Sequence, residues 1–255
     1  MATAQKLRCQ VQKITDHGDH VYTVDLEPER PLPRFKPGQF LHLTLDDYDP
    51  SGFWPESRVF SIASSPAQRN DLRISYSVKG RYTSRMENEL HEGHWVWAKL
   101  PYGDFVIRDA NNVVLLAGGT GITAFISFIA GLSGPPAAFH NSIFLAYGAR
   151  NPALLLYRET IAARTTAENG FQVFYFVENG VENEKANKFT ATDSASPECF
   201  TASGCLSLDV IWNRLKNPRT ATYYIAGSPA MIQALTGNLL SKNIAPEQIK
   251  VDAWE

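Results

Sequence analysis

Cysteine is scarce in this chain, and its scarcity excludes several kinds of site. Three cysteines occur among the 255 residues, at positions 9, 199 and 205. This count excludes an iron–sulfur cluster held by four thiolates, and no CxxC pair is present to bind a metal. Cys199 and Cys205 are close enough in sequence to pair if oxidised, but free, partly buried thiols are the expected state. His91 and His94 lie at a predicted turn without a third ligand nearby in sequence, so no metal site is expected.

A strong excess of one charge and long apolar runs are also missing. Lys and Arg number 24 against 26 Asp and Glu, which gives a formal net charge of -2. This balance provides no basic field for nucleic acid and no polybasic membrane anchor. The longest apolar runs fall short of the roughly 20 residues that a spanning helix needs, and the N-terminus has no apolar signal core. We therefore expect a cytoplasmic location, no membrane span and no nucleic-acid partner.

Short strand-like segments fill the first part of the chain. β-Branched and aromatic residues alternate with polar ones at residues 8–14, 20–27, 39–45, 57–62 and 72–78, and turn residues rich in Gly, Pro, Asp and Asn separate them. One short helix is expected at 83–90, followed by strands at 95–100 and 104–108. Several short strands without a long helix indicate an antiparallel β-barrel or sandwich.

From residue 112 the pattern changes to alternating strands and helices. Apolar strands are expected at 113–117, 142–147, 171–177, 222–226 and 248–251, with helices at 123–132, 155–168, 206–215 and 229–240. Such alternation predicts a parallel sheet covered on both faces. We expect a hinge at 108–112, a first domain of residues 1–110, a second of residues 111–255, and a polar surface loop at 179–203.

A glycine-rich turn at residues 113–124, VVLLAGGTGITA, stands out within the second half. An apolar strand gives way to Gly118, Gly119 and Gly121, and the residues from Thr123 onward have helical spacing. Glycines allow close approach of backbone N–H groups, and a helix N-terminus favours an anionic phosphate. The spacing G-G-x-G is not a full dinucleotide fingerprint, so taken alone it is equally typical of a packing turn.

A second motif, Arg58-Val59-Phe60-Ser61, follows FKPGQFLHL at residues 35–43. Here the chain resembles the ferredoxin–NADP reductase superfamily, whose flavin motif is Arg-x-aromatic-Ser after a Pro-Gly-Gln-aromatic strand. Further matches follow in the family's order: GRYTS at 80–84, PYGDF at 101–105, LAGGTGIT at 116–123, YGAR at 147–150 and AGSPAM at 226–231. The resemblance covers nearly the whole chain and implies a β-barrel flavin domain followed by an α/β nucleotide-binding domain.

The resemblance implies a flavin site in the barrel. Arg58 offers a planar fork of donors to the flavin phosphates, and Phe60 is placed against the isoalloxazine ring, where the family more often has tyrosine. Without this context, Arg58 is typical of a surface ion pair and Phe60 of a core aromatic. The turn and helix start at 80–84 would present N–H groups to a pyrophosphate, which favours FAD over FMN. The implied flavin-binding residues are Arg58, Val59, Phe60, Ser61, Ser75, Ser77, Gly80, Tyr82, Thr83 and Ser84.

The resemblance also implies a dinucleotide site in the second domain. NADP-specific relatives often carry a Ser-Arg pair after the third strand, where this chain has Glu178. A carboxylate can accept hydrogen bonds from ribose hydroxyls and repels a 2′-phosphate, so we expect NADH over NADPH; the alternative is a solvated glutamate at a strand end. The implied nicotinamide-dinucleotide residues are Gly119, Thr120, Gly121, Thr123, Gly148, Arg150, Glu178, Gly227, Ser228 and Met231.

Three residues are implied near the reacting atoms. Ser61 would lie by flavin N5, Asp252 would be an acidic group near the nicotinamide, and Trp254 would stack over the flavin face; the alternative for Asp252 and Trp254 is packing at the chain terminus. The family's cysteine beside the hydride path is replaced by Ala226, which is expected to weaken activity at most, since the cofactors carry the hydride chemistry.

The function implied is an FAD-dependent NAD(P)H oxidoreductase that moves hydride from NADH to bound FAD. Electrons would pass on to a separate acceptor protein, such as a ferredoxin or an oxygenase component, because the chain has no fused cluster-binding segment. Two alternatives stay open at this point: an NADH:flavin reductase that releases reduced flavin, and a non-catalytic flavin- or dinucleotide-binding module that senses redox state.

Overall fold

The structure is a computed structural model that describes residues 3–108, 112–132, 142–165, 170–179 and 199–252. The chain divides into two compact units: Met1–Val106 with Ile126–Gly131, and Ile107–Phe125 with Leu132–Glu255. In the part of the chain described, no helix is both long and apolar enough to cross a bilayer. The domain boundary after residue 110 and the hinge stay predictions, because residues 109–111 lie outside the described ranges.

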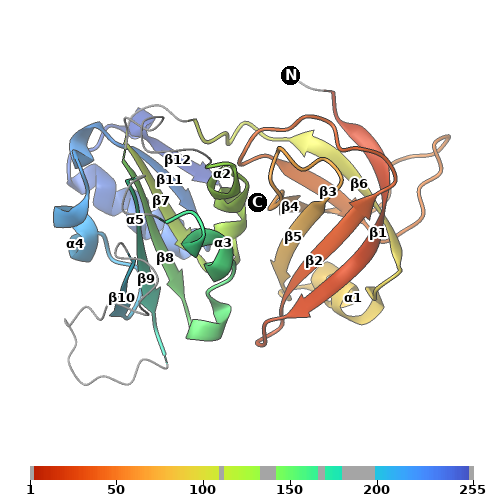
Figure 1. Ribbon diagram of the computed structural model, residues 1–255, viewed down its shortest axis with the longest axis horizontal. Helices are drawn as coiled ribbons and strands as arrows, with labels where there is room; N and C mark the ends of the chain where they lie inside the picture. The colour runs from red at the N-terminus through yellow and green to blue at the C-terminus, as the bar shows by residue number, and fades with distance from the viewer. Residues whose placement is uncertain (1–2, 109–111, 133–141, 166–169, 180–198, 253–255) are drawn as a thin grey trace. The chain divides into compact units, whose positions relative to one another are not determined.

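The first unit is a nearly closed antiparallel barrel of six strands in the order β4-β3-β6-β1-β2-β5 (Figure 1). The edge strands β4 and β5 approach each other where the Ala63 amide donates to the Arg73 carbonyl at 2.9 Å. The strands are β1 (Gln5–Asp16), β2 (Val21–Pro28), β3 (Phe40–Thr44), β4 (Arg58–Ser61), β5 (Leu72–Ser77) and β6 (Trp95–Tyr102). The predicted barrel is therefore confirmed.

Every second side chain along the strands points into the barrel, and these apolar side chains fill its interior. On β5, Leu72, Ile74 and Tyr76 are buried in one apolar core, as the two-residue side-chain period requires. The helix α1 (Arg81–Glu89) packs Tyr82 and Met86 into the same core and lies at one end of the barrel (Figure 1). Its first turn is thereby fixed close to β3 and β4, which matters for the flavin motif.

The predicted strand at residues 104–108 does not form. The chain turns at Gly103, which has φ +93°, and the side-chain amide of Gln39 donates to the Gly103 carbonyl at 3.1 Å. The next residues pack against a turn instead of a strand: a Cβ placed on Gly38 would lie 2.3 Å from the Phe105 carbonyl oxygen. Phe105 in this segment therefore packs against the turn at Gly38.

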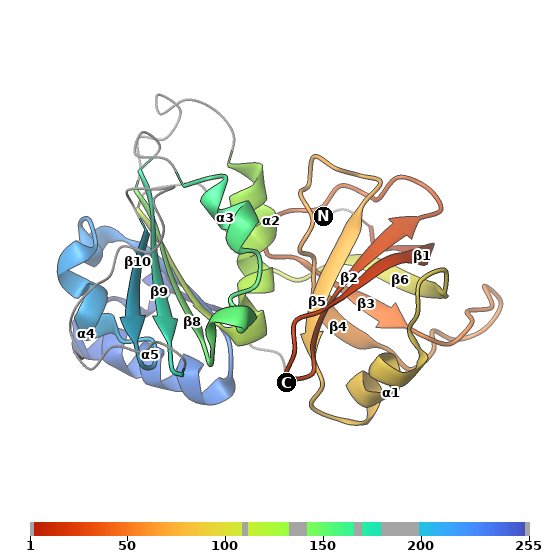
Figure 2. The same cartoon turned by 60° about the horizontal axis from the view of Figure 1, so that its bottom comes forward.

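The second unit is a six-stranded parallel sheet in the order β10-β9-β8-β7-β11-β12. Helix α3 and the start of α2 cover one face, and α4 and α5 cover the other (Figure 2). The strands are β7 (Val113–Gly118), β8 (Ile143–Ala149), β9 (Phe171–Val177), β10 (Cys199–Ser203), β11 (Thr222–Ala226) and β12 (Ile249–Asp252), and the helices are α2 (Thr123–Gly131), α3 (Arg158–Ala162), α4 (Leu208–Ile211) and α5 (Pro229–Ser241). The predicted α/β domain is confirmed.

Three elements of this unit differ from the sequence prediction. The polar segment 179–203 ends in the edge strand β10, which pairs in parallel with β9; residues 180–198 lie outside the described ranges. In the described part of the helix predicted at 155–168, the helix is α3, which begins only after Tyr157 because that residue has the left-handed φ of +61°; residues 166–168 lie outside the described ranges. The helix predicted at 206–215 becomes α4 followed by a short 3-10 turn, Trp212–Arg214.

Candidate cofactor-binding sites

The parallel sheet changes winding direction between β7 and β11. From β7 the chain adds β8, β9 and β10 on one side, and then returns to add β11 and β12 on the other. Loops that leave neighbouring strands in opposite directions open a crevice at the carboxyl ends, where open α/β sheets bind their ligands. The predicted glycine-rich turn and the Gly227-Ser228 turn both lie at this switch point, because β7 and β11 are paired neighbours.

Close packing explains why glycines stand at this point. A Cβ on Gly121 would lie 2.4 Å from the Ala226 carbonyl oxygen, so no side chain fits there. The thioether of Met231 fills the space beside Gly118 and Gly227. A Cβ on Gly118 would lie 2.4 Å from the Met231 sulfur, and a Cβ on Gly227 would lie 2.6 Å from the Met231 Cε. The motif at 116–123 and the motif at 226–231 are therefore two halves of one packed structure.

Two helix starts lie at this end of the sheet. A 3-10 turn, η1 (Gly119–Ile122), leads into α2, and the Thr123 hydroxyl donates to the Thr120 carbonyl at 2.8 Å. Gly119 has φ +53° with open space around its Cα, so its backbone can be approached from outside. At α5, the Ser228 hydroxyl accepts from the Met231 amide at 3.3 Å. Free N–H groups of both first turns suit the pyrophosphate of a dinucleotide.

The neighbouring strands bring further predicted residues to the same carboxyl end of the sheet. Gly148 pairs in register with Gly118, and the amides of Glu178 and Asn179 donate to the carbonyls of Ala149 and Arg150 at 3.1 and 2.7 Å. Glu178 is thus fixed at the end of β9, one strand away from Arg150. The roles of Arg150 and Glu178 in dinucleotide binding stay predictions.

Cys205 is a neighbour of Glu178 that sequence reasoning missed. It follows β10, whose pairing with β9 returns the chain to this edge, and the Gly204 amide donates to the Val177 carbonyl at 2.8 Å. Burial, the Glu178 charge and a hydrogen bond to that carboxylate raise the pKa of the exposed Cys205 thiol. A prediction of strand β10 from the sequence would have revealed this neighbour, because β10 places residue 205 beside residue 178.

The residues assigned to the reacting atoms fall in different units. Ser61 ends β4 in the barrel and is 9% exposed, whereas Asp252 ends β12 in register with Ala226 and is 6% exposed. Trp254 lies outside the described residues. The catalytic assignments of all three stay predictions. Among the residues described, no group of three or more His, Cys, Asp or Glu side chains could hold a metal ion.

In the barrel, the flavin motif forms the edge strand β4. Arg58 pairs with Leu43 and Ser61 with Phe40 on β3, so the motif is held in fixed register. Arg58 is exposed, while Phe60 packs against the barrel core with its ring centroid 6.2 Å from that of Tyr76, edge to face. Val59 is half-buried between them. The strand therefore presents Arg58 outward and fixes Phe60 by packing.

The start of α1 lies close to Arg58. The Tyr82 hydroxyl donates to the Leu43 carbonyl at 2.8 Å and accepts from the Leu45 amide at 3.2 Å, which ties α1 to β3. The Arg58 guanidinium lies over the Tyr82 ring, 4.9 Å from its centroid. Gly80 caps the helix, and the Thr83 hydroxyl accepts from the Lys79 and Gly80 amides at 2.9 and 3.2 Å. The structure thus unites the motif at 58–61 with the motif at 80–84.

The remaining predicted flavin residues lie on neighbouring elements. Ser75 on β5 is 6% exposed, and its hydroxyl is 2.7 Å from that of Thr23 on β2. Ser77 is half-buried two residues further along β5, and Ser84 lies in the first turn of α1, where its amide donates to the Gly80 carbonyl at 2.9 Å. Direct contact of these three serines with flavin stays a prediction.

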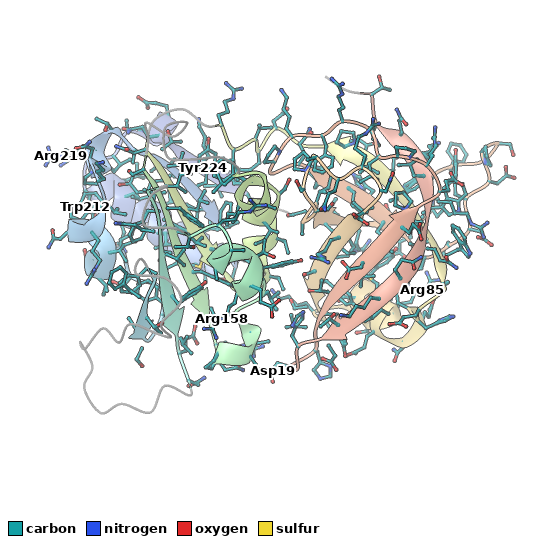
Figure 3. The ribbon with its side chains drawn as sticks, viewed as in Figure 1. Asp19, Arg85, Arg158, Trp212, Arg219 and Tyr224 are labelled. Atoms are coloured by element: carbon teal, nitrogen blue, oxygen red, sulfur yellow. The ribbon has the colours of Figure 1, made fainter. Side chains whose placement is uncertain are left out.

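Two charged residues beside this site were not predicted. Arg81 opens α1, and its Nη2 lies 3.0 Å from each oxygen of the Glu56 carboxylate; Arg58 Nη2 lies 3.3 Å from one of them. Further along the helix, Arg85 turns to other partners, Asp46 at 2.6 Å and Glu89 at 2.7 Å (Figure 3). The only sequence signal for Arg81 was its place directly after Gly80, and none pointed to Glu56.

Comparison with known proteins finds relatives among oxidoreductases. Residues 115–236 match the oxidoreductase NAD-binding domain. The chain is 24% identical over 259 residues to the reductase component of propane 2-monooxygenase from Mycolicibacterium smegmatis (strain ATCC 700084 / mc(2)155), covering 98% of this chain and 68% of that protein. It is 25% identical over 234 residues to the flavohemoprotein of Bacillus subtilis (strain 168), covering 90% of this chain and 54% of the relative.

A solved structure agrees over the full length. The fold matches that of a ferredoxin NADP+ reductase from Neisseria gonorrhoeae with bound FAD and NADP, with a TM-score of 0.71, 19% identity and 99% coverage of both chains. The chain therefore has the fold of a ferredoxin–NADP+ reductase. Together with the NAD-binding match and the reductase-component relative, this fold supports an oxidoreductase that uses a flavin and a pyridine nucleotide.

Proposed function

We propose that this chain takes electrons from NADH onto bound FAD and delivers them to a separate acceptor protein. The observation that carries the proposal is the packed switch point, where Gly121 lies against Ala226 and two helices begin at the same end of the sheet. A site built of close-packed glycines and free N–H groups suits a dinucleotide pyrophosphate. The arginine at β4 and the start of α1 supply the corresponding donors for a flavin.

Glu178 supports NADH as the donor. It ends β9 at the carboxyl edge, is exposed, and lies near Cys205. An ionised carboxylate accepts hydrogen bonds from two ribose hydroxyls and repels a 2′-phosphate dianion. For the flavin, a phosphate-binding arginine next to a second phosphate-facing element supports FAD over FMN, since FAD carries two phosphates.

Each residue near the reacting atoms has a proposed role beside the bound flavin. The bound flavin supplies hydride acceptance and the onward transfer of electrons. Ser61 would hold its hydroxyl by flavin N5, Asp252 would orient the nicotinamide side, and Trp254 would cover the flavin face until nicotinamide enters. Holding both cofactors in alignment is the main contribution expected of the protein.

The acceptor assignment draws on the relatives. The Mycolicibacterium relative is named as a reductase component, which implies a separate component that receives its electrons. We propose that this chain likewise serves a separate acceptor protein, such as a ferredoxin or an oxygenase component, and works as a soluble protein of the cytoplasm.

Flavin retention separates this proposal from its rivals. The purified protein, loaded with FAD and passed through gel filtration, should keep the flavin and then reduce a ferredoxin with NADH in the absence of free flavin. If FAD is lost on the column and NADH oxidation is proportional to added free flavin, the protein is a flavin reductase. If FAD is retained but NADH does not reduce it, the protein is a binding module.

A further inference from the structure

We propose that Arg81 is a second pyrophosphate-binding arginine, and that Glu56 holds Arg81 and Arg58 together as an internal stand-in for the flavin pyrophosphate. The inference rests on the proposed flavin function and adds two residues to its binding site. It assigns FAD selectivity to a pair of guanidinium groups and a competing carboxylate.

The geometry brings two arginines from different elements onto one anion. Arg58 belongs to the edge strand β4, and Arg81 is the first residue of α1. Arg81 Nη2 lies 3.0 Å from both Glu56 oxygens, and Arg58 Nη2 lies 3.3 Å from Oε1. Because a single carboxylate reaches both guanidinium groups, a single bridging anion of similar or greater length can also reach both.

The balance of charge at this point is positive. One carboxylate faces two guanidinium groups, and the first turn of the nine-residue helix α1 adds the positive end of its dipole. The acids further along α1 have other partners: Glu87 binds His20 and Tyr22, and Glu89 binds Arg85. The site therefore favours an anion with more charge than one carboxylate.

The ion pairs are exposed enough to exchange partners. The side chain of Arg81 is 84% exposed and that of Glu56 is 39% exposed, so water screens their attraction. Such surface pairs contribute little to stability, which means that Glu56 can be displaced at low cost. Arginine also forms two parallel hydrogen bonds with phosphate, which this carboxylate arrangement does not offer Arg81.

The number of phosphates decides which flavins respond. FAD has two linked phosphates, so each can be bound by one arginine, whereas FMN has one phosphate and riboflavin has none. Removal of Arg81 should therefore weaken FAD more than FMN and leave riboflavin unchanged. Removal of the Glu56 charge should strengthen FAD, because the competing carboxylate is gone.

Flavin fluorescence quenching on the apoprotein tests this directly. Titrations with FAD, FMN and riboflavin would compare the wild type with Arg81→Gln, Arg81→Lys and Glu56→Gln. Arg30→Gln is the matched control, since Arg30 lies in the same unit and donates to the Lys6 carbonyl at 3.1 Å. We expect Arg81→Gln to raise the Kd for FAD about tenfold and that for FMN about twofold or less, Arg81→Lys to recover part of the loss, and Glu56→Gln to lower the Kd for FAD about threefold.

The outcomes separate this inference from the function beneath it. The inference is overturned if Arg81→Gln changes the affinities for FAD and riboflavin equally, or if it leaves the affinity for FAD unchanged. In either case, FAD binding by the wild type still supports the flavin function. Weaker FAD binding by Glu56→Gln also overturns it, because Glu56 would then position the arginines instead of competing. Absence of FAD binding by the wild type overturns the proposed function and the inference with it. Unchanged thermal unfolding of each apo variant shows that the affinity changes are local.

Discussion

Gly121 lies directly against the backbone carbonyl of Ala226 on the neighbouring strand, so closely that a methyl group on Gly121 would come within 2.4 Å of that oxygen. The contact joins the turn after β7 to the end of β11 at the point where the sheet reverses its winding. The glycine is therefore required for packing as well as for access to a ligand. Both roles can be tested in one variant.

Gly121→Ala should destabilise the second unit and weaken NADH binding. The added methyl group forces the turn away from Ala226, which costs about 1–3 kcal/mol in the free energy of unfolding. Gly237→Ala is the matched control: it lies within α5 with open space around it, and alanine there should be neutral or stabilising by up to about 1 kcal/mol. Urea denaturation and NADH titration measure both effects. Equal stability and NADH affinity of Gly121→Ala and the wild type would contradict the packing at the switch point.

Glu178→Gln should shift the choice of nucleotide. The substitution keeps the shape of the side chain and removes the charge that repels a 2′-phosphate, so the ratio of kcat/KM for NADH to that for NADPH should fall about tenfold. Glu159→Gln, an exposed acid in the first turn of α3, is the control and should leave the ratio unchanged. The assignment fails if both variants keep the wild-type ratio under steady-state conditions.

Cys205 should report on the same edge of the sheet. Burial and the neighbouring Glu178 carboxylate raise the pKa of its thiol, so iodoacetamide at mildly alkaline pH should label it more slowly than a free thiol. Glu178→Gln should accelerate labelling about threefold, and NADH should protect the residue. Burial raises the pKa of Cys9 to about 12, so that thiol should stay unreactive. Mass spectrometry of the labelled peptides gives each rate. If neither NADH nor Glu178→Gln changes the labelling rate of Cys205, then Cys205 does not lie at the nucleotide site.

The His20–Glu87 pair predicts a pH dependence in the barrel. The hydrogen bond to Glu87, 2.7 Å from Nδ1, and the Glu87 charge raise the pKa of the exposed His20 above its ordinary 6.5. The same contact, with the hydrogen bond from Tyr22, lowers the pKa of Glu87. Because the folded pKa of His20 is raised, its contribution to stability is complete below the ordinary value and lost as the pH rises through the raised value. Because that of Glu87 is lowered, its contribution is lost on acidification through the lowered value.

NMR titration of the imidazole protons measures this pair. The His20 pKa should lie above the ordinary value in the wild type and return toward it in Glu87→Gln. His17 serves as an internal comparison, since burial lowers its pKa. A His20 titration that is the same in the wild type and the variant would show that the pair does not form in solution.

Local pattern was enough to predict the order of both units. Alternation at 72–78 predicts the inward Leu72 and Ile74, and the apolar runs at 171–177 and 222–226 predict β9 and β11 residue for residue. These signals depend on near neighbours along the chain. The two motifs at 116–123 and 226–231 were also visible, although their packing against each other through Met231 was not.

The errors arise where tertiary contacts override the local pattern. The apolar run within residues 104–108 is typical of a strand, but Phe105 packs against the turn at Gly38. The polar composition before Cys199 concealed the edge strand β10. The approach of Arg81 to Glu56 joins residues far apart in sequence, and no spacing rule connects them. Sequence therefore pointed to Arg58 and the turn at 80–84, but not to Arg81 and Glu56 beside them.

Anaerobic titration of the FAD-loaded protein with NADH tests the central claim most directly. The account predicts that NADH bleaches the flavin absorbance stoichiometrically and rapidly, that NADPH does so much more slowly, and that mass spectrometry of the released flavin identifies FAD. A protein that binds no flavin, or whose bound flavin keeps its oxidised spectrum with excess NADH, would contradict it.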